Sequence, residues 1–143
     1  MAFTMTNRGL FYLMNNAISA STDFRCLVFK TTTPSVAAIR DYNFVSDLLA
    51  ATTEAAASGY SRVDLAGVAI AENDSPDTVT LTATAPTITS VAAGETWLGI
   101  GYYIEGASDA ARTLIAVDVP ASSVTTDGNN VELPALSITV TGS

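Results

Sequence analysis

Short segments in which apolar and polar residues alternate dominate the chain after Arg62. Residues Thr78–Ala85 alternate four threonines with four apolar side chains, and Leu136–Thr141 repeats the pattern with Leu, Ile and Val against Ser and Thr. This period of two is typical of a strand with one buried and one solvated face. Clusters of turn-forming residues lie before these segments at Asn73–Asp77 and Asp127–Asn130. The pattern therefore predicts antiparallel strands joined by tight turns.

Four other segments are also predicted to be strands. Trp97–Ile104 is apolar on both faces, which suits a central strand, and its two glycines leave room for a neighbouring side chain or backbone. Phe24–Lys30 and Thr113–Val119 are strand-like, and Arg62–Ala71 has a strand pattern that Gly67 interrupts. We expect the hydrophobic centre of the fold to lie at Trp97–Ile104.

Helical spacing is confined to the first part of the chain. Thr6 or Asn7 is positioned to cap a short helix over Arg8–Ile18, and apolar residues at helical intervals predict a second over 43–57. The fold class is therefore predicted to be mainly β: an antiparallel sandwich or barrel of six to eight strands with one or two short N-terminal helices.

The chain is expected to form a single domain over residues 1–143. Its length suits one core, and no change in composition marks a boundary. We divide it into an N-terminal arm or helix over residues 1–20 and a β domain over residues 21–143, which includes the short helix near 43–57.

Charge is sparse and unevenly distributed. Charged residues make up 14% of the chain, and its formal net charge is −8. Residues 63–143 carry one basic and ten acidic side chains. Such a surface repels phosphate backbones and anionic membranes, and no apolar run is long enough to span a bilayer. We therefore expect neither nucleic acid nor membrane as a partner.

The residues needed for most catalytic chemistry are scarce. The chain has no histidine, which excludes Ser-His-Asp and Cys-His arrangements, and its one cysteine, Cys26, is expected to be a buried strand residue. The Gly-Ile-Gly at Gly99–Gly101 lacks the rest of a dinucleotide-binding fingerprint. Paired carboxylates are the remaining possibility for a glycosidase, and none of the candidates has a diagnostic setting. These candidates are Glu72, Asp74, Asp77, Glu95, Glu105 and Asp109.

Calcium binding by Asn73, Asp74 and Asp77 is an alternative to simple turn formation, although their spacing does not match an EF-hand loop. Turn formation is the preferred interpretation. The sequence therefore predicts a non-enzymatic protein with no catalytic residue, cofactor or metal ligand.

Several short motifs resemble a family of small virion proteins of tailed bacteriophages. The resemblance covers roughly residues 40–120, together with the opening motif, and follows the order of segments in that family. The matching residues are Met5, Thr6, Asn7 and Arg8; Ser58, Gly59, Tyr60, Ser61, Arg62, Leu65 and Gly67; Glu72, Asn73, Asp74 and Asp77; Gly101–Glu105; and Thr113–Ala116.

The resemblance implies a head decoration (capsid cement) protein or another minor structural protein of the virion. A decoration protein is expected to be made in the host cytoplasm, to bind the outer surface of the major capsid shell, and to stabilise it through many repeated weak contacts. We expect it to associate with copies of itself, a trimer being one candidate. The residues predicted to contact the major capsid protein or a neighbouring copy are Phe3, Met5, Arg8, Phe11 and Tyr12.

Two alternatives remain open at the level of sequence. A tail, neck or fibre protein would have the same composition. A carbohydrate-binding or adhesive β module would use Trp97, Tyr102 and Tyr103 as an aromatic platform for sugars. Burial of Trp97 would count against this second alternative.

Overall fold

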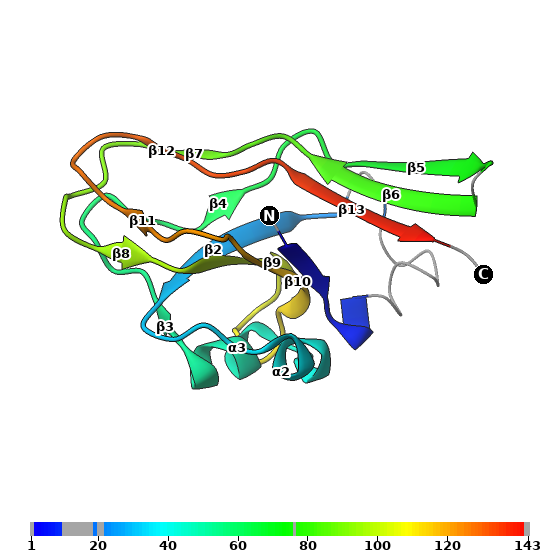
Figure 1. The fold of residues 1–143 in the computed structure, drawn as a ribbon, viewed down its shortest axis with the longest axis horizontal. Coiled ribbons are helices and arrows are strands. Elements are labelled where there is room, and N and C mark those ends of the chain that lie inside the picture. The colour runs from blue at the N-terminus through cyan, green and yellow to red at the C-terminus, as the bar shows by residue number, and fades with distance from the viewer. Residues whose placement is uncertain (1, 10–18, 20–21, 76, 142–143) are drawn as a thin grey trace.

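The computed structural model of the chain describes residues 2–9, 19, 22–75 and 77–141, apart from the side chains of residues 2 and 77 (Figure 1). Among these residues, seven strands have four or more residues, and six have two residues. The longer strands are β1 (Ala2–Met5), β2 (Phe24–Lys30), β5 (Ala69–Asp74), β6 (Asp77–Ala83), β9 (Gly99–Ile104), β10 (Thr113–Val119) and β13 (Leu136–Thr141). The shorter strands are β3 (Thr53–Glu54), β4 (Val63–Asp64), β7 (Thr87–Ile88), β8 (Thr96–Trp97), β11 (Val124–Thr125) and β12 (Val131–Glu132).

The largest sheet is antiparallel and has six strands. Its main order is β1-β10-β9-β2-β3, and β4 pairs with the other end of β2. Strand β9 lies at its centre, as expected from the apolar run Trp97–Ile104. The predicted strand is shorter than expected, because Trp97 belongs to β8, which pairs with β11. A side chain on Gly101 would collide with Leu48, and one on Gly99 would collide with Phe29. The two glycines lie on the same face of the central strand, where their lack of a side chain lets Phe29 and Leu48 pack closely against it.

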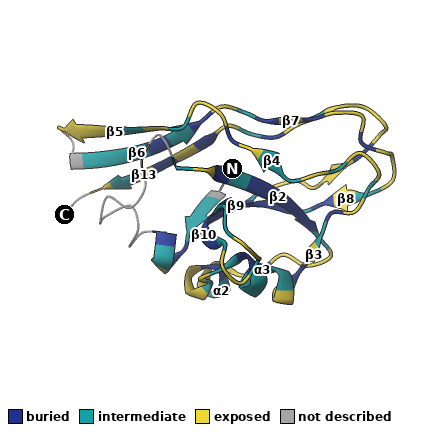
Figure 2. Cartoon of the chain, turned by 180° about the vertical axis from the view of Figure 1, so that it is seen from behind, coloured by how far each residue is buried: buried dark blue, intermediate teal, exposed yellow. Residues whose placement is uncertain are grey.

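Strands β5, β6 and β13 form a separate three-stranded sheet with β6 in the middle. A small ladder, β12-β7, continues this layer toward the other end of the molecule, where a second ladder, β11-β8, lies beside β2 (Figure 1). One core cluster joins this layer to the six-stranded sheet through side chains such as Phe24, Leu81 and Trp97. The architecture is thus mainly β and sandwich-like, with β2, β9 and β10 as its most buried strands (Figure 2).

Two short helices cover the opposite face of the six-stranded sheet (Figure 1). These are α2 (Val36–Asp41) and α3 (Val45–Ala51). Helix α2 buries Ile39, and α3 buries Val45 and Leu48 in a second core cluster against β2, β9 and β10. The sheet is therefore packed on both faces, which explains why its central strands are apolar on both sides.

The predicted strands Phe24–Lys30 and Thr113–Val119 are confirmed with the same boundaries. The predicted strand Arg62–Ala71 is instead two strands, β4 and β5, separated by Gly67, which has a positive φ of 63°. The break at Gly67 is as expected, because this backbone conformation strongly favours glycine.

The helix predicted over 43–57 is shorter than expected, because the chain leaves α3 after Ala51 and Thr53–Glu54 pairs with β2. Helix α2 was not predicted. Its N-cap is Ser35, whose hydroxyl oxygen accepts a hydrogen bond from the Ala38 N–H. Residues 7–9 are helical, so the helix predicted over Arg8–Ile18 begins one residue earlier than expected, and its remaining residues, 10–18, lie outside the described residues.

Candidate functional site

The N-terminal residues predicted to form an interface begin as an edge strand of the large sheet. Strand β1 pairs only with β10 among the described residues, which places Phe3 opposite Asp118 and Met5 opposite Ala116. Phe3 and Met5 are half-buried and pack against the core, and the ring of Phe3 lies 5.7 Å from that of Tyr102. Both side chains therefore keep part of their surface exposed in the free chain.

Thr6 fixes the turn that follows β1. Its hydroxyl donates a hydrogen bond to the Leu114 carbonyl at 2.6 Å and accepts one from the Gly9 N–H at 2.8 Å. This second bond is the N-cap contact predicted for Thr6. The guanidinium of Arg8 lies 4.7 Å from the centre of the Phe44 ring, within the range of a cation–π contact. The other two predicted interface residues, Phe11 and Tyr12, lie outside the described residues.

A groove of about 480 Å³ runs between β1 and β13, the edge strands of the two larger sheets. Consecutive residues of each strand line it, although their side chains point to opposite faces. The groove therefore runs along the edges of the two strands. The described residues that line it include no acidic side chain. They are Phe3, Thr4, Met5, Thr6, Asn7, Arg40, Ile138, Thr139 and Val140.

Arg40, the basic residue among the described lining of the groove, differs in its pairing from most other basic residues of the chain. Arg40 is exposed and forms no ion pair with the described residues. By contrast, the side chains of Arg25, Lys30, Arg62 and Arg112 all pair with carboxylates. The groove is therefore an uncharged to basic surface on an otherwise acidic protein.

A network of ion pairs connects the ends of several strands. Arg62 bonds to Glu54 at 2.7 Å and to Asp109 at 2.6 Å, and Arg112 joins Asp109 at 2.9 Å to Glu105 at 2.5 Å. The hydrogen bond from Arg62 holds the pKa of Asp109 below its usual range. Burial alone would raise the pKa of Glu105, but hydrogen bonds from the backbone and Arg112 lower it.

The network brings together Glu105 and Asp109, two of the six carboxylates considered as candidates for a glycosidase. A general acid at neutral pH needs a raised pKa, whereas Glu105 and Asp109 both have lowered ones. The geometry therefore favours a role in holding the loop between β9 and β10.

Glu95 is a second structural carboxylate. It forms an ion pair with Lys30 and accepts hydrogen bonds from the Trp97 indole at 2.8 Å and from the backbone N–H groups of Ala56 and Ala57. Burial opposes ionisation, but these donors together lower the pKa of Glu95 to about 2. Sequence reasoning did not identify this role, because Lys30, Ala56 and Ala57 lie far from Glu95 along the chain.

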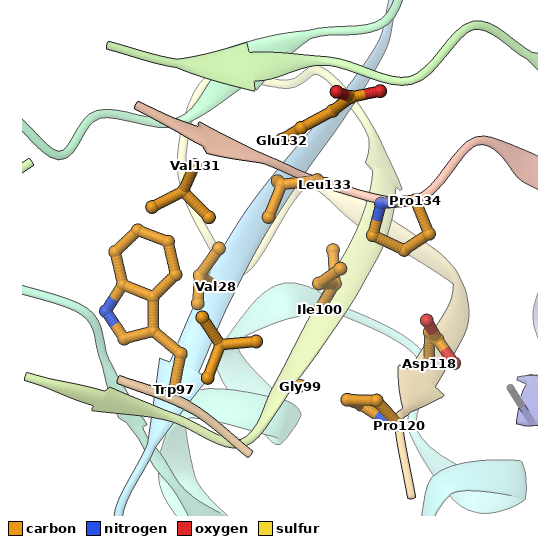
Figure 3. Close-up of a pocket in the computed structure, with 11 residues that line it drawn as sticks. Val28, Trp97, Gly99, Ile100, Asp118, Pro120, Val131, Glu132, Leu133 and Pro134 are labelled. Carbon is orange, nitrogen blue, oxygen red and sulfur yellow. The ribbon is translucent and has the colours of Figure 1, made fainter. Parts of the chain in front are cut away.

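A small cavity of about 120 Å³ lies between the large sheet and the segment around β12 (Figure 3). Val28, Trp97 and Ile100 point into it from one side, beneath Val131 and Leu133. Ligand pockets usually have volumes of about 300–1,000 Å³, so this space is too small for a sugar or a nucleotide.

The proposed aromatic platform for sugars is excluded by burial. Trp97 is 3% exposed, and Tyr102 and Tyr103 are fully buried. The Trp97 ring packs edge-on against Tyr60, with their centres 5.8 Å apart. These aromatic residues stabilise the core and present no face to a ligand.

Other candidate chemistry has structural explanations. Cys26 is buried in β2, as predicted, and burial raises the pKa of its thiol to about 12. Asn73, Asp74 and Asp77, the candidates for calcium binding, belong to the β5–β6 hairpin. Within the described ranges, no group of three or more His, Cys, Asp or Glu residues is placed to hold a metal ion.

None of the helices in the described ranges is long and apolar enough to cross a membrane.

The fold and its surfaces define a mainly β, antiparallel protein with a groove between two sheet edges whose described lining residues include no acid. The chain matches no family model, no curated protein and no solved structure.

Proposed function

We propose that this protein is a non-enzymatic structural component of a tailed-bacteriophage virion, of the head decoration type. It would bind the outer surface of the major capsid protein and stabilise the shell. The observation that carries the proposal is the groove beside β1, which half-buried Phe3 and Met5 line together with Arg40, a cation that forms no ion pair with the described residues. A groove of mixed apolar and polar character suits docking of another protein.

The distribution of charge supports a shell partner over DNA. The net charge is −8, and four of the six basic residues pair with carboxylates of the same chain. Few cations are therefore left to displace counterions from a nucleic acid. Docking of another protein on the apolar side chains of the groove, with the aid of Arg40, does not need a cluster of cations.

The described part of the proposed contact consists of Phe3, Met5 and Arg8, and the same contact would extend to Phe11 and Tyr12. Each copy would contribute a small area. Many copies on one shell would then stabilise it together, since bridging neighbouring subunits makes successive contacts effectively intramolecular. Self-association of the decoration protein would add to this effect.

Cosedimentation tests the proposal. The purified protein is mixed with empty phage heads and, separately, with tails, and the bound copies are counted. We expect many copies on heads. A few copies bound only to tails would instead support the tail or neck assignment, and binding to neither would overturn a virion role.

Two variants on helix α2 test the contribution of the groove. Arg40→Glu reverses the cation in the groove, whereas Val36→Glu places the same side chain at an exposed position that does not line it. We expect Arg40→Glu to reduce the copies bound to heads by about tenfold at limiting concentration, a change of about 1.4 kcal/mol in binding free energy. Val36→Glu should bind like the unmodified chain, and equal binding by both variants would contradict a role for the groove.

A further inference from the structure

Strand β13 is an edge strand without the features that usually prevent edge pairing. Among the described residues it pairs only with β6, and its six residues, Leu136–Thr141, include no charge, proline or glycine. Natural edge strands are commonly protected by charges, prolines, bulges or a covering segment. The opposite edge of this sheet, β5, does carry charges, at Glu72 and Asp74.

We propose that β13 pairs antiparallel with β13 of a second copy of this chain across a two-fold axis. The two three-stranded sheets would then form one continuous six-stranded sheet with the order β5-β6-β13-β13-β6-β5. The added strand would occupy the groove between β13 and β1, at the ordinary strand spacing of about 4.8 Å from β13. This pairing concerns the free protein and does not rest on the proposed virion function. Because both contacts use the same groove, a copy paired in this way would have to separate before its groove docks on the shell.

Charge explains why a second copy suits this edge. The chain carries a net charge of −8, so most of its surface repels another copy. The groove beside β13 is an exception, because its described lining residues include no acid and include Arg40. Pairing through β5 would instead bring Glu72 and Asp74 of both copies together.

The alternation along β13 permits self-pairing, and two registers pair the largest part of the strand. Ile138 and Val140 lie on the inner face with Leu81 and Val79 of β6, and Thr139 lies on the outer face with Thr80. Directly opposed residues of antiparallel strands share a face, so odd residues must oppose odd and even must oppose even. Pairing centred on either residue 138 or residue 139 satisfies this rule. Both registers place the two copies of Thr139 opposite or diagonal to one another.

Charges introduced at Thr139 provide a direct test by sedimentation velocity over a range of concentrations. We expect the unmodified protein to form dimers. Thr139→Lys and Thr139→Glu should each weaken the dimer by about tenfold or more, because like charges would meet across the axis. An equimolar mixture of the two variants should restore dimers, since opposite charges then face each other.

A matched control separates edge pairing from damage to the fold. Thr80→Lys places the same charge on the same face, directly opposite Thr139 but on the central strand β6. It should dimerise nearly as well as the unmodified chain, and thermal unfolding should show that all variants remain folded.

Three results would overturn the proposal. These are an unmodified protein that stays monomeric up to millimolar concentration, dimers that both Thr139 variants leave intact, or single variants that are monomeric and whose mixture fails to dimerise. A monomeric unmodified protein that still binds heads would refute the β13 pairing while supporting the virion role. Dimers that bind neither heads nor tails would support the β13 pairing and refute the virion role.

Discussion

A single carboxylate, that of Glu95, joins three separate segments of the chain. It contacts Lys30 at the end of β2, the backbone at Ala56 and Ala57 after β3, and Trp97 in β8. Removing it leaves a partly buried ammonium and several N–H donors without their acceptor. Such groups are costly because their lost interactions with water are no longer replaced.

Glu95→Gln should therefore lower the free energy of unfolding by about 1–3 kcal/mol at neutral pH. The folded-state pKa is about 2, below its usual value of 4.5. The stabilisation is thus present above pH 4.5 and is lost as the pH falls toward 2. Urea unfolding at both ends of this range measures the effect. Glu72→Gln, at an exposed edge position, is the control and should change stability little; equal behaviour of the two variants would disprove the role of Glu95.

Gly9 allows the N-terminal segment to lie close to the large sheet. A Cβ atom at this position would collide with the backbone of Ile115. Gly9→Ala should therefore destabilise the protein by about 1–3 kcal/mol, as overpacked sites commonly do. It should also increase hydrogen exchange at Thr4 and Met5 in β1.

Mass spectrometry of exchanged peptides measures this effect, with Asn7→Ala as a control because Asn7 is exposed in the same segment. Unchanged protection of β1 in Gly9→Ala would show that the sheet tolerates the extra atom by a local shift.

At the scale of elements, Arg62 links β3 to the loop between β9 and β10. Its guanidinium bonds to Glu54 and Asp109 with about one-fifth of the side chain exposed. Arg62→Ala should lower the free energy of unfolding by about 1–3 kcal/mol and raise the pKa of Asp109 toward its usual value. A carboxyl NMR titration measures that pKa. Arg40→Ala, which breaks no ion pair among the described residues, should leave it unchanged.

The stabilisation from Asp109 is present above the usual pKa of an aspartate and is lost as the pH falls through the lowered folded-state value. Acid should therefore destabilise the unmodified protein more than Arg62→Ala. A pH dependence that is the same in both proteins would show that Arg62 does not control this carboxylate.

The sequence predicted best those elements in which nearly every residue is buried. Phe24–Lys30 and Thr113–Val119 are apolar on both faces, and their strand boundaries agreed with the structure. Helix α2 was missed because only Ile39 is buried in it, which leaves little periodicity to detect. The helix over 43–57 was drawn too long because pairing of Thr53–Glu54 with β2 overrides local preference.

The candidate site was less predictable than the fold. The N-terminal residues could be selected for their aromatic and apolar character, but the groove depends on β13, more than 130 residues from β1 along the chain. Likewise, Arg62 and Asp109 are 47 residues apart. Local patterns carry no information about such contacts, because the topology of the sheets creates them.

For the whole molecule, burial predicts a gradient of local stability. Strands β9 and β10 are almost entirely buried, whereas most of β5 is exposed on an edge of the smaller sheet (Figure 2). Amides in β9 and β10 should therefore exchange only upon global unfolding, and those in Glu72–Asp74 should exchange much faster. Hydrogen exchange of the intact chain tests this order. Equal protection in both regions would show that the two sheets open as one unit.

The burial of Cys26 also supplies a natural chemical probe. Its thiol is 1% exposed at the centre of the large sheet, and its pKa of about 12 leaves almost no thiolate at neutral pH. A thiol-specific reagent should thus modify it only after β2 separates from its neighbours. The rate of modification would report how often the sheet opens, without any engineered label. Comparing that rate with and without empty phage heads would test whether the proposed attachment slows the opening of each copy.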